Sequence, residues 1–452
     1  MSTRARISRV VPTREQGLAE PAAVRRRGER ARARAATVAV FVARHRVRFA
    51  IVVVLAIALG VRTAVYLADP RSLDGAGLTA QQGEIARNIV DHGTWFVVNR
   101  QAYELLKQRQ TEEQMLVDPE SVDFSSVDRE SAAQPVIDQM PGLGVVLAAL
   151  WWSTGNKVYA PIQWLQILLD TAMVLLVYWI GVRLTRSARV GLLAAFLYAV
   201  WLGAIVVAKR PMLDTWSGFF TIGCVALFVW ARERPTSKRR LVLLGLVTGI
   251  GIYFRPFVVL LPIALALLAT PGGGWRRRLA WIAVPTATAL LVLAPWTIRN
   301  YYEFDRFIPT RTGLGQAVFE GIGEAYSDEE AERHVRENRP DATYGSPAYD
   351  DFLLGGALRA IAEDPGWYLR LIGERLRFLL PCLLAVLAWW RWREAALIPV
   401  AAAVATVVPY LAIGSDARFY LPAAFAYFIL FAMTIELAAS RAVRARRWAP
   451  EP

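Results

Sequence analysis

The sequence is short of the residues that build disulfide frameworks and zinc sites. It contains two cysteines, and both Cys224 and Cys382 fall inside apolar stretches rather than polar loops. This placement argues against a disulfide framework. The three histidines are far apart along the chain and complete no metal-binding spacing with these cysteines. We therefore predict neither a disulfide-stabilised secreted domain nor a zinc site.

The sequence also lacks the polar composition of the two or three soluble domains that 452 residues would otherwise suggest. Apolar residues make up 55% of it, in blocks of about 17–22 residues. A helix of that length crosses the ~30 Å hydrocarbon core of a bilayer. The 16 tryptophans and 15 tyrosines suit helix ends that meet lipid headgroups. The pattern predicts an all-α polytopic membrane protein.

The net charge of +14 is not spread over one basic face. The arginines cluster in the N-terminal tail and in short gaps between apolar blocks, which is the positive-inside pattern rather than a nucleic-acid footprint. The tail arginines from Arg25 to Arg48 are interpreted as a cytoplasmic topology signal, with contact to anionic membrane lipids as the alternative. We expect no nucleic-acid partner. Because the tail is too long for a cleaved secretory signal, the first apolar block is predicted to stay as an anchor.

The chain is predicted to have a transmembrane module over residues 49–440, between a disordered basic tail over 1–48 and a short tail over 441–452. The block 141–152 is too short to cross and is expected to lie at the outer surface or dip into it. The other blocks predict ten spans, at about 49–68, 161–182, 190–208, 215–231, 241–253, 257–270, 279–297, 375–390, 395–413 and 419–438.

The short loops determine the predicted orientation. With a cytoplasmic N-terminus, the turns rich in Lys or Arg all fall inside, as does the C-terminal tail; these turns are 183–189, 232–240, 271–278 and 391–394. The segments left outside are two long ones, 69–140 and 298–372, and three short ones, 209–214, 254–256 and 414–418. We expect both termini in the cytoplasm of a bacterium and the protein in its cytoplasmic membrane.

The first long outer segment carries helix signals, so we expect it to be structured. Residues 79–82 (Thr-Ala-Gln-Gln) fit a capping box, and Gly93 fits a helix end. Between them Glu84, Asn88 and His92 recur every four residues and therefore share one helix face.

The second long outer segment carries two similar signals. Residues 327–330 (Ser-Asp-Glu-Glu) fit another capping box, and Asp364-Pro365 is typical of a helix start. We therefore expect helices after both points.

Ionisable residues near the outer face are the candidates for function, because charge near hydrocarbon is costly unless it is used or paired. The acidic candidates are Asp69, Asp74, Glu84, Asp138, Asp214 and Asp416, and the basic ones are Arg62, Arg87, Lys209, Arg210, Arg255, Arg299 and Arg418. Outward-facing cations depart from the positive-inside trend, which indicates an anionic partner. A phosphate at the bilayer surface fits the forked donors of arginine.

Each candidate also has a structural interpretation that stays open. Arg62 would snorkel from the first span, and Arg255 and Arg299 would anchor helix ends. Asp214 would be a helix N-cap, and Asp74 a turn residue.

Several short segments resemble those of one enzyme superfamily. They are Ile85–Gly93, Met140–Leu143, Met212–Asp214, Phe254–Pro256, Pro295–Asn300 and Ala417–Pro422. In this order along the chain and on the predicted outer side of the membrane, these segments resemble those of the GT-C superfamily of membrane glycosyltransferases. The resemblance covers about residues 45–440. Within that superfamily, the sequence resembles the group of protein O-mannosyltransferases and lipid A aminoarabinose transferases, of the glycosyltransferase family 39 type.

The resemblance implies an inverting sugar transfer from a polyprenyl-phosphate donor to a hydroxyl of a lipid, glycan or protein. An acid in the first outer loop would be the base, and arginines would stabilise the leaving phosphate. It implies catalytic roles for Asp74, Glu84 and Asp214, donor-phosphate contacts from Arg87, Lys209, Arg210, Arg255, Arg299 and Arg418, and substrate contacts from Asn88, Asp138 and Tyr420. No cofactor is required, although Asp74 and Asp214 leave room for Mg²⁺ or Mn²⁺.

One position departs from the superfamily pattern. Many relatives have their acid eight residues before the alanine that matches Ala86, and here that position is Leu78. Asp74 is favoured as the base, with Glu84 as its competitor. Two other hypotheses stay open: a lipid or solute transporter, whose polar residues usually lie near the bilayer midplane, and an inactive relative.

Overall fold

The computed structural model describes residues 22–73, 76–128, 133–270, 272, 274–324, 327–414 and 417–447. The chain divides into two units, residues 1–50 and 51–452. The first unit contributes the beginning of helix α1 (Ala22–Ala68), which has non-helical backbone angles at His45. The tail expected over 1–48 thus overlaps this helix from Ala22 on, and its first 21 residues lie outside the described part.

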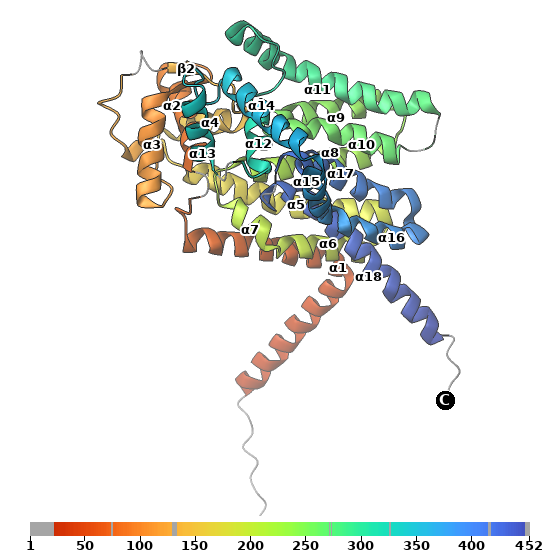
Figure 1. Cartoon of the computed structure of the whole chain (residues 1–452). Helices are drawn as coiled ribbons and strands as arrows, with labels where there is room; N and C mark the ends of the chain where they lie inside the picture. Colours follow the sequence, from red (N-terminus) through yellow and green to blue (C-terminus); the bar gives the residue numbers. More distant parts are fainter. Residues whose placement is uncertain are drawn as a thin grey trace, which may run out of the picture. The chain divides into compact units, whose positions relative to one another are not determined.

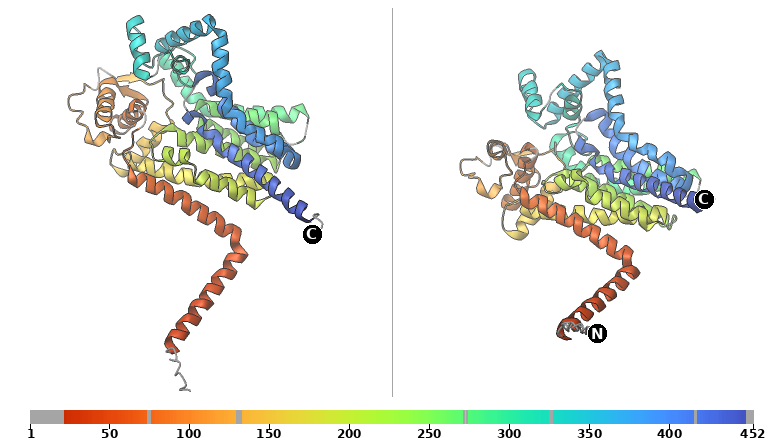
Figure 2. Two further views of the ribbon diagram at one scale, coloured as in Figure 1. Left: turned by 60° about the horizontal axis from the view of Figure 1, so that its bottom comes forward. Right: turned by 90° about the horizontal axis from the view of Figure 1, so that it is seen from below.

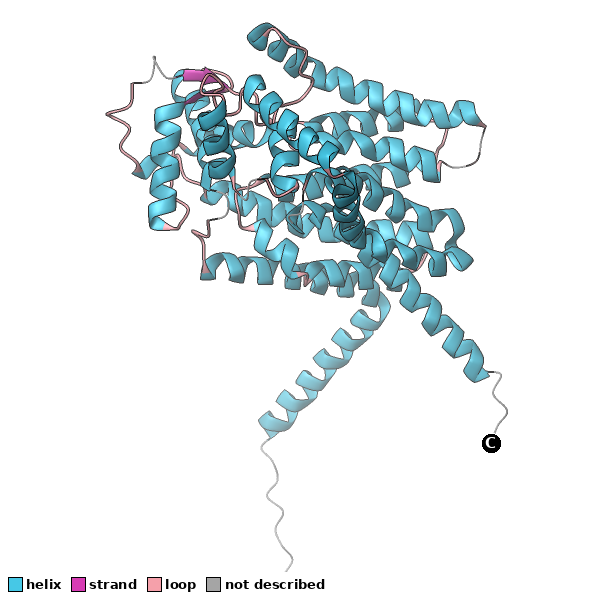
Figure 3. Cartoon of the chain, viewed as in Figure 1, coloured by secondary structure: helices cyan, strands magenta, loops and turns pink. Residues whose placement is uncertain are grey.

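The second unit is a helical bundle (Figures 1 and 3). Besides the end of α1, its long helices are α5 (Ala160–Thr185), α8 (Leu213–Arg232), α11 (Trp275–Phe304) and α18 (Ala424–Arg447). Its shorter bundle helices are α6 (Ala188–Ala199), α7 (Leu202–Ala208), α9 (Lys238–Ile252), α10 (Leu260–Ala269), α16 (Leu384–Trp392) and α17 (Leu397–Ile413). Four 3-10 turns adjoin them: η2 (Pro256–Val259), η3 (Leu376–Leu383), η4 (Arg393–Ala396) and η5 (Ala417–Ala423).

The protein is a multi-pass membrane protein. In the described part of the chain, six helical stretches are long and apolar enough to cross a bilayer, or seven if the bent pair α6 and α7 counts as one span. The predicted ten spans are not confirmed. The predicted spans 375–390 and 395–413 lie in a single helical stretch, Pro365–Ile413, and the spans that became α9 and α10 are short helices.

The two long segments predicted to lie outside the membrane, here named the outer segments, form two small helical layers at one end of the bundle (Figure 2). The first contains α2 (Ala76–His92), α3 (Arg100–Glu113), η1 (Pro119–Ser121) and α4 (Gly142–Thr154). Its strands β1 (Val97–Asn99) and β2 (Ala133–Pro135) pair antiparallel, with Val98 opposite Gln134. The second contains α12 (Leu314–Gly321), α13 (Asp328–Asn338), α14 (Pro347–Glu363) and α15 (Pro365–Arg375).

Most local helix signals are confirmed. Gly93 ends α2 with a φ of +64°, which glycine adopts without steric cost. The Ser327 side chain accepts from Glu330 N, and Asp364 accepts from Trp367 N. The capping box at residues 79–82 is wrong, because α2 already begins at Ala76 and Thr79 lies one turn inside it.

Small residues allow close helix packing in the bundle. A Cβ atom on Gly245 of α9 would lie 2.6 Å from Pro285 O of α11, and one on Gly249 would lie 2.6 Å from Val292 Cβ. Glycines four residues apart let two helix backbones approach in this way. The α9–α11 contact thereby supports the turn at residues 254–257, which enters the candidate site.

Candidate functional site

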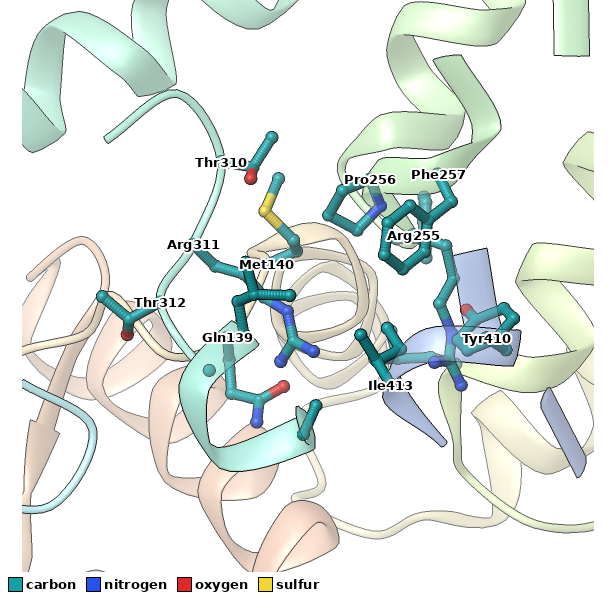
Figure 4. A pocket seen from close by; sticks show the side chains of 15 residues that line it. Gln139, Met140, Arg255, Pro256, Phe257, Thr310, Arg311, Thr312, Tyr410 and Ile413 are labelled. Atoms are coloured by element: carbon teal, nitrogen blue, oxygen red, sulfur yellow. The ribbon is translucent and has the colours of Figure 1, made fainter. Parts of the chain in front are cut away.

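A cavity of about 250 Å³ lies where five chain segments meet (Figure 4). They are residues 139–140 before α4, the first residue of α8, the turn 254–257, residues 310–313 with the first turn of α12, and the end of α17. Its walls combine apolar side chains such as Met140, Phe257 and Ile413 with a few polar groups. The sequence had assigned four of these segments, all but the end of α17, to the outer face or its edge.

Arg255 stands on one side of this cavity and is fixed by an acid. Its guanidinium donates to Asp214 Oδ1 at 2.6 Å. Asp214 is buried in the first turn of α8, where the helix dipole favours negative charge. The N-cap of α8 is Met212, so the interpretation of Asp214 as the N-cap is wrong. The structure brings the predicted residues Asp214 and Arg255 together.

Arg311 stands on the other side of the cavity, beside Gln139 (Figure 4). It donates to Asp138 O at 2.8 Å. Burial, followed by the positive charge of Arg255, lowers the pKa of Arg311, yet a guanidinium stays charged at physiological pH. Two arginines facing one small apolar cavity make a site that favours an anion.

Asp138 joins the two outer segments beside this cavity. Both of its carboxylate oxygens accept from Gln81 Nε2, at 2.9 and 2.8 Å. Burial raises the pKa of Asp138, and the Gln81 contact lowers it in part. A Cβ atom on Gly345 would lie only 2.9 Å from Asp138 Cγ, so the glycine allows the second segment to close over the acid.

Glu84, Arg87 and Asn88 form a separate buried cluster within the first outer segment. Arg87 donates to both Glu84 oxygens, at 2.7 and 2.9 Å, and Asn88 donates to Glu84 at 3.0 Å. The Arg87 guanidinium also lies 4.0 Å from the ring centre of Phe124. The shared helix face is confirmed for Glu84 and Asn88. None of Glu84, Arg87 and Asn88 lines the cavity of Figure 4.

Lys209 and Arg210 form a third group, in the turn between α7 and α8. Lys209 Nζ donates to the side chain of Asp69 at 2.8 Å and to its carbonyl at 3.0 Å. The hydrogen bond from Lys209 is the main cause that lowers the pKa of Asp69, and the charge of Arg210 adds to it. This group ties the end of α1 to the start of α8.

The remaining predicted contacts hold chain segments together or lie outside the description. Arg299 donates to Val136 O at 2.7 Å and to Phe96 O at 3.2 Å, which fastens the first outer segment to α11. Tyr420 donates to Gly414 O at 3.1 Å and stacks on Phe378. Asp74 and the side chain of Arg418 lie outside the described residues.

Comparisons with known proteins give this architecture its context. Residues 141–303 match the family model of dolichyl-phosphate-mannose-protein mannosyltransferases. The oligosaccharyltransferase of Archaeoglobus fulgidus is 14% identical, with 87% of this chain and 49% of that chain covered at a TM-score of 0.52. Its form tethered to an acceptor peptide gives 14% identity, coverage of 89% and 50%, and a TM-score of 0.54.

The chain has the GT-C fold. It spans about half the length of the oligosaccharyltransferase chains that it matches. ArnT of Cupriavidus metallidurans bound to undecaprenyl phosphate is 16% identical, with coverage of 87% and 63% at a TM-score of 0.47, too low to establish a common fold by itself. The resemblance seen in the sequence is confirmed for the fold and for residues 141–303.

Within this GT-C bundle the sequence missed a buried ion pair. Arg62 of α1 donates to Asp170 of α5, and Tyr198 of α6 donates to the same carboxylate at 2.9 Å. Arg62 also donates to Ala199 O, at the break between α6 and α7, at 2.8 Å. Arg62 is fully buried, so the prediction that it snorkels to the interface is wrong.

Arg311 was missed as well. It is an isolated arginine in the 75 residues of the second outer segment, and no pattern distinguishes it from surface arginines. The Gly313 that follows it indicates only a turn.

The described residues that line the cavity include no carboxylate side chain. Among the described residues, no three His, Cys, Asp or Glu side chains gather as a metal site. Asp214, one predicted ligand, is bonded to Arg255. The other predicted ligand, Asp74, lies outside the described residues, and the steps proposed below use no cation.

Proposed function

We propose that this protein is an inverting glycosyltransferase, which moves a hexose or pentose from a polyprenyl-phosphate donor to a hydroxyl acceptor outside a bacterial cytoplasmic membrane. The observation that carries this proposal is the pair Arg255 and Arg311, which faces one apolar-walled cavity. The family match to dolichyl-phosphate-dependent mannosyltransferases supports it. So does the similar fold of the Archaeoglobus oligosaccharyltransferase, one structure of which holds an inhibitory peptide and a dolichol-phosphate.

The two arginines would act on the leaving group. As the bond from the sugar's anomeric carbon to the phosphate oxygen breaks, its electron pair stays on the lipid phosphate. Arg255 and Arg311 would stabilise this growing charge, because charge-assisted hydrogen bonds are stronger at a low local dielectric. Asp214 would hold Arg255 in place, as its 2.6 Å contact indicates.

The acceptor side needs a carboxylate that takes the hydroxyl proton as the oxygen attacks from the opposite face. We propose Asp74 for this role. Its competitor Glu84 already accepts three hydrogen bonds from Arg87 and Asn88 and is 1% exposed. A carboxylate engaged in this way is poorly placed to receive a proton from a substrate.

The first experiment measures donor binding and sugar transfer in the purified full-length protein. Arg255→Gln and Arg311→Gln should each weaken polyprenyl-phosphate binding by about 10- to 100-fold, since hydrogen bonds to charged groups contribute about 1.5–3 kcal/mol. Arg370→Gln is the matched control, because its side chain is 72% exposed and outside the cavity. Unchanged binding in both cavity variants would contradict the proposed donor site.

The second experiment separates the two acids. Asp74→Asn should preserve donor binding and lower transfer at least about 100-fold, the usual contribution of a general base. Glu84→Gln should lower the thermal unfolding midpoint more than the turnover of the folded fraction. If Asp74→Asn retains full transfer, the base assignment is wrong. Mg²⁺ or Mn²⁺ dependence is tested in the same assay with a chelator.

A lipid flippase is the second candidate. The buried pair Arg62 and Asp170 and the 55° bend between α6 and α7 favour it, because transporters use intramembrane charges and broken helices. Lipid movement across vesicles without any sugar transfer would support this candidate. An inactive relative would bind the donor lipid and show neither activity.

A further inference from the structure

A second cavity lies between the two long outer segments, and none of its wall residues is shared with the cavity of Figure 4. Its volume is about 210 Å³, the space of roughly seven water molecules in the liquid. Its walls include Arg100 and Gln134 from the first segment and Glu332, Arg336, Tyr344 and Tyr349 from the second. A ligand bound here contacts both segments at once.

Charged side chains form one wall of this second cavity. Arg100 donates to Glu332 Oε1 at 3.0 Å, and Arg336 donates to the same oxygen at 3.1 Å. Arg100 also pairs with Glu104 Oε1 at 2.7 Å. A guanidinium carries five N–H donors and a carboxylate about four acceptor positions, so these contacts of Arg100, Arg336 and Glu332 do not use all of them. The wall therefore offers donors and acceptors side by side.

Aromatic side chains form the adjoining wall. The Tyr344 and Tyr349 rings meet edge to face, with centres 5.3 Å apart. The Arg100 guanidinium lies 5.1 Å from the centre of the Tyr344 ring. Tyr349 is 1% exposed, so the Tyr344 ring stands against a buried neighbour.

A hydrogen bond connects the walls of the two cavities. Tyr344 lines the second cavity, and the next residue, Gly345, accepts from Thr312 Oγ1 at 2.8 Å. Thr312 lines the first cavity, next to Arg311. A molecule in the second cavity thus lies beside the cavity that would hold the donor phosphate.

We propose that this second cavity binds a sugar ring of a glycan acceptor, an inference that rests on the proposed function and names its acceptor class. Neighbouring sugar hydroxyls both donate and accept hydrogen bonds, and the adjacent Arg100, Glu332 and Arg336 supply both partners. The C–H face of a sugar ring packs on an aromatic ring such as Tyr344. Glu332 disfavours a purely anionic ligand.

The test measures direct binding to the full chain in lipid nanodiscs. The probes are neutral tetrasaccharides of mannose, galactose or arabinose and a Ser/Thr-containing hexapeptide, with saturation-transfer NMR as the readout. At least one tetrasaccharide should bind the wild type, and Glu332→Gln and Tyr344→Leu should each weaken it about tenfold or more. Arg333→Gln is the control on the same helix, with a side chain that is 67% exposed.

Polyprenyl-phosphate binding is measured in parallel and should be unchanged in these variants. Equal sugar affinity in the wild type and both cavity variants overturns the proposal. It is also overturned if no tetrasaccharide binds, or if the hexapeptide alone binds and depends on Glu332. Failure of the wild type to bind polyprenyl phosphate counts instead against the proposed function. Glu332→Gln preserves shape, so the test holds even if Tyr344→Leu unfolds.

Discussion

Arg62 illustrates how a single residue inside a membrane bundle organises several helices. Its guanidinium reaches Asp170 on α5 and the carbonyl of Ala199 at the end of α6. A break in an intramembrane helix leaves backbone carbonyls without helical partners, and each unsatisfied one is costly in lipid. Arg62 therefore helps to stabilise the bend at which α7 begins.

We predict that Arg62→Met destabilises the protein by about 3–5 kcal/mol, because it leaves Asp170 as an unpaired buried charge. The double variant Arg62→Met with Asp170→Leu should recover much of this loss, since both charges are then gone. Unfolding in mixed micelles measures both. A single variant as stable as the wild type would show that the pair contributes nothing.

Asp69 gives a second prediction, on pH. Lys209 lowers the pKa of Asp69 below its usual 3.8, so the pair stabilises the folded state above that pH and loses this effect as the pH falls through the lower folded value. Asp69→Asn should be less stable than the wild type at pH 7, by less than about 1 kcal/mol because Asp69 is 58% exposed. The difference should vanish once the pH falls below the lowered pKa of Asp69. A pH-independent difference in unfolding midpoints would contradict this.

Single residues were the hardest part of the molecule to predict from the sequence. The sequence predicts Asp214 and Arg255 as site residues because they lie in short polar gaps at the predicted outer ends of the apolar blocks. The structure joins the two side chains by a hydrogen bond. Arg311 and the partner of Arg62 depend on how each helix rotates about its axis and how loops fold back. A pattern of apolar blocks carries no information on either.

At the scale of elements, the α9–α11 contact depends on having no side chain at two positions. A Cβ atom added at Gly245 or at Gly249 would lie only 2.6 Å from its nearest neighbour on α11. The neighbour of Gly245, Pro285 O, is a backbone atom. The lengths of the apolar blocks predicted α9 and α11. The bounds of α9 and α10 and the bend between α6 and α7 depend on helix packing, which block lengths do not describe.

We predict that Gly249→Leu separates α9 from α11 and lowers the thermal unfolding midpoint, with a cost of about 1–3 kcal/mol or more from overpacking. The control is Gly223→Leu on α8, where an added Cβ meets nothing within 4 Å. Because α9 carries the 254–257 turn, donor binding should weaken in the Gly249 variant alone. Equal midpoints for the two variants would contradict the close-packing argument.

At the scale of the whole molecule, the outer segments gather at one end of the bundle, and the basic turns belong to other segments (Figure 2). The predicted topology puts both long segments on the same side of the membrane, and it follows from the charges of the short loops alone. The gathering of these segments at one end of the bundle agrees with that part of the prediction. The side of the membrane stays a prediction, as does the cytoplasmic position of both termini.

Cysteine labelling tests that topology. In a background with Cys224 and Cys382 replaced, a cysteine at Arg370 should react with a membrane-impermeant reagent in intact cells, and one at Arg234 should react only after permeabilisation. Arg370 lies on α15 of the second outer segment, and Arg234 lies in the basic turn after α8. The reverse pattern would invert the orientation and move the candidate site to the cytoplasmic side.

The shortness of α9 has a consequence for the bilayer itself. Its 15 residues rise about 22 Å, which is less than the ~30 Å hydrocarbon core. With its basic first turn at the inner interface, the far end of α9 at Ile252 would sit about 8 Å beneath the outer boundary of the hydrocarbon, and Arg255 follows three residues later. Hydrophobic mismatch of this size is relieved by local thinning of the bilayer. The membrane would then dip toward the cavity, and donor binding would depend on the acyl-chain length of the surrounding lipids.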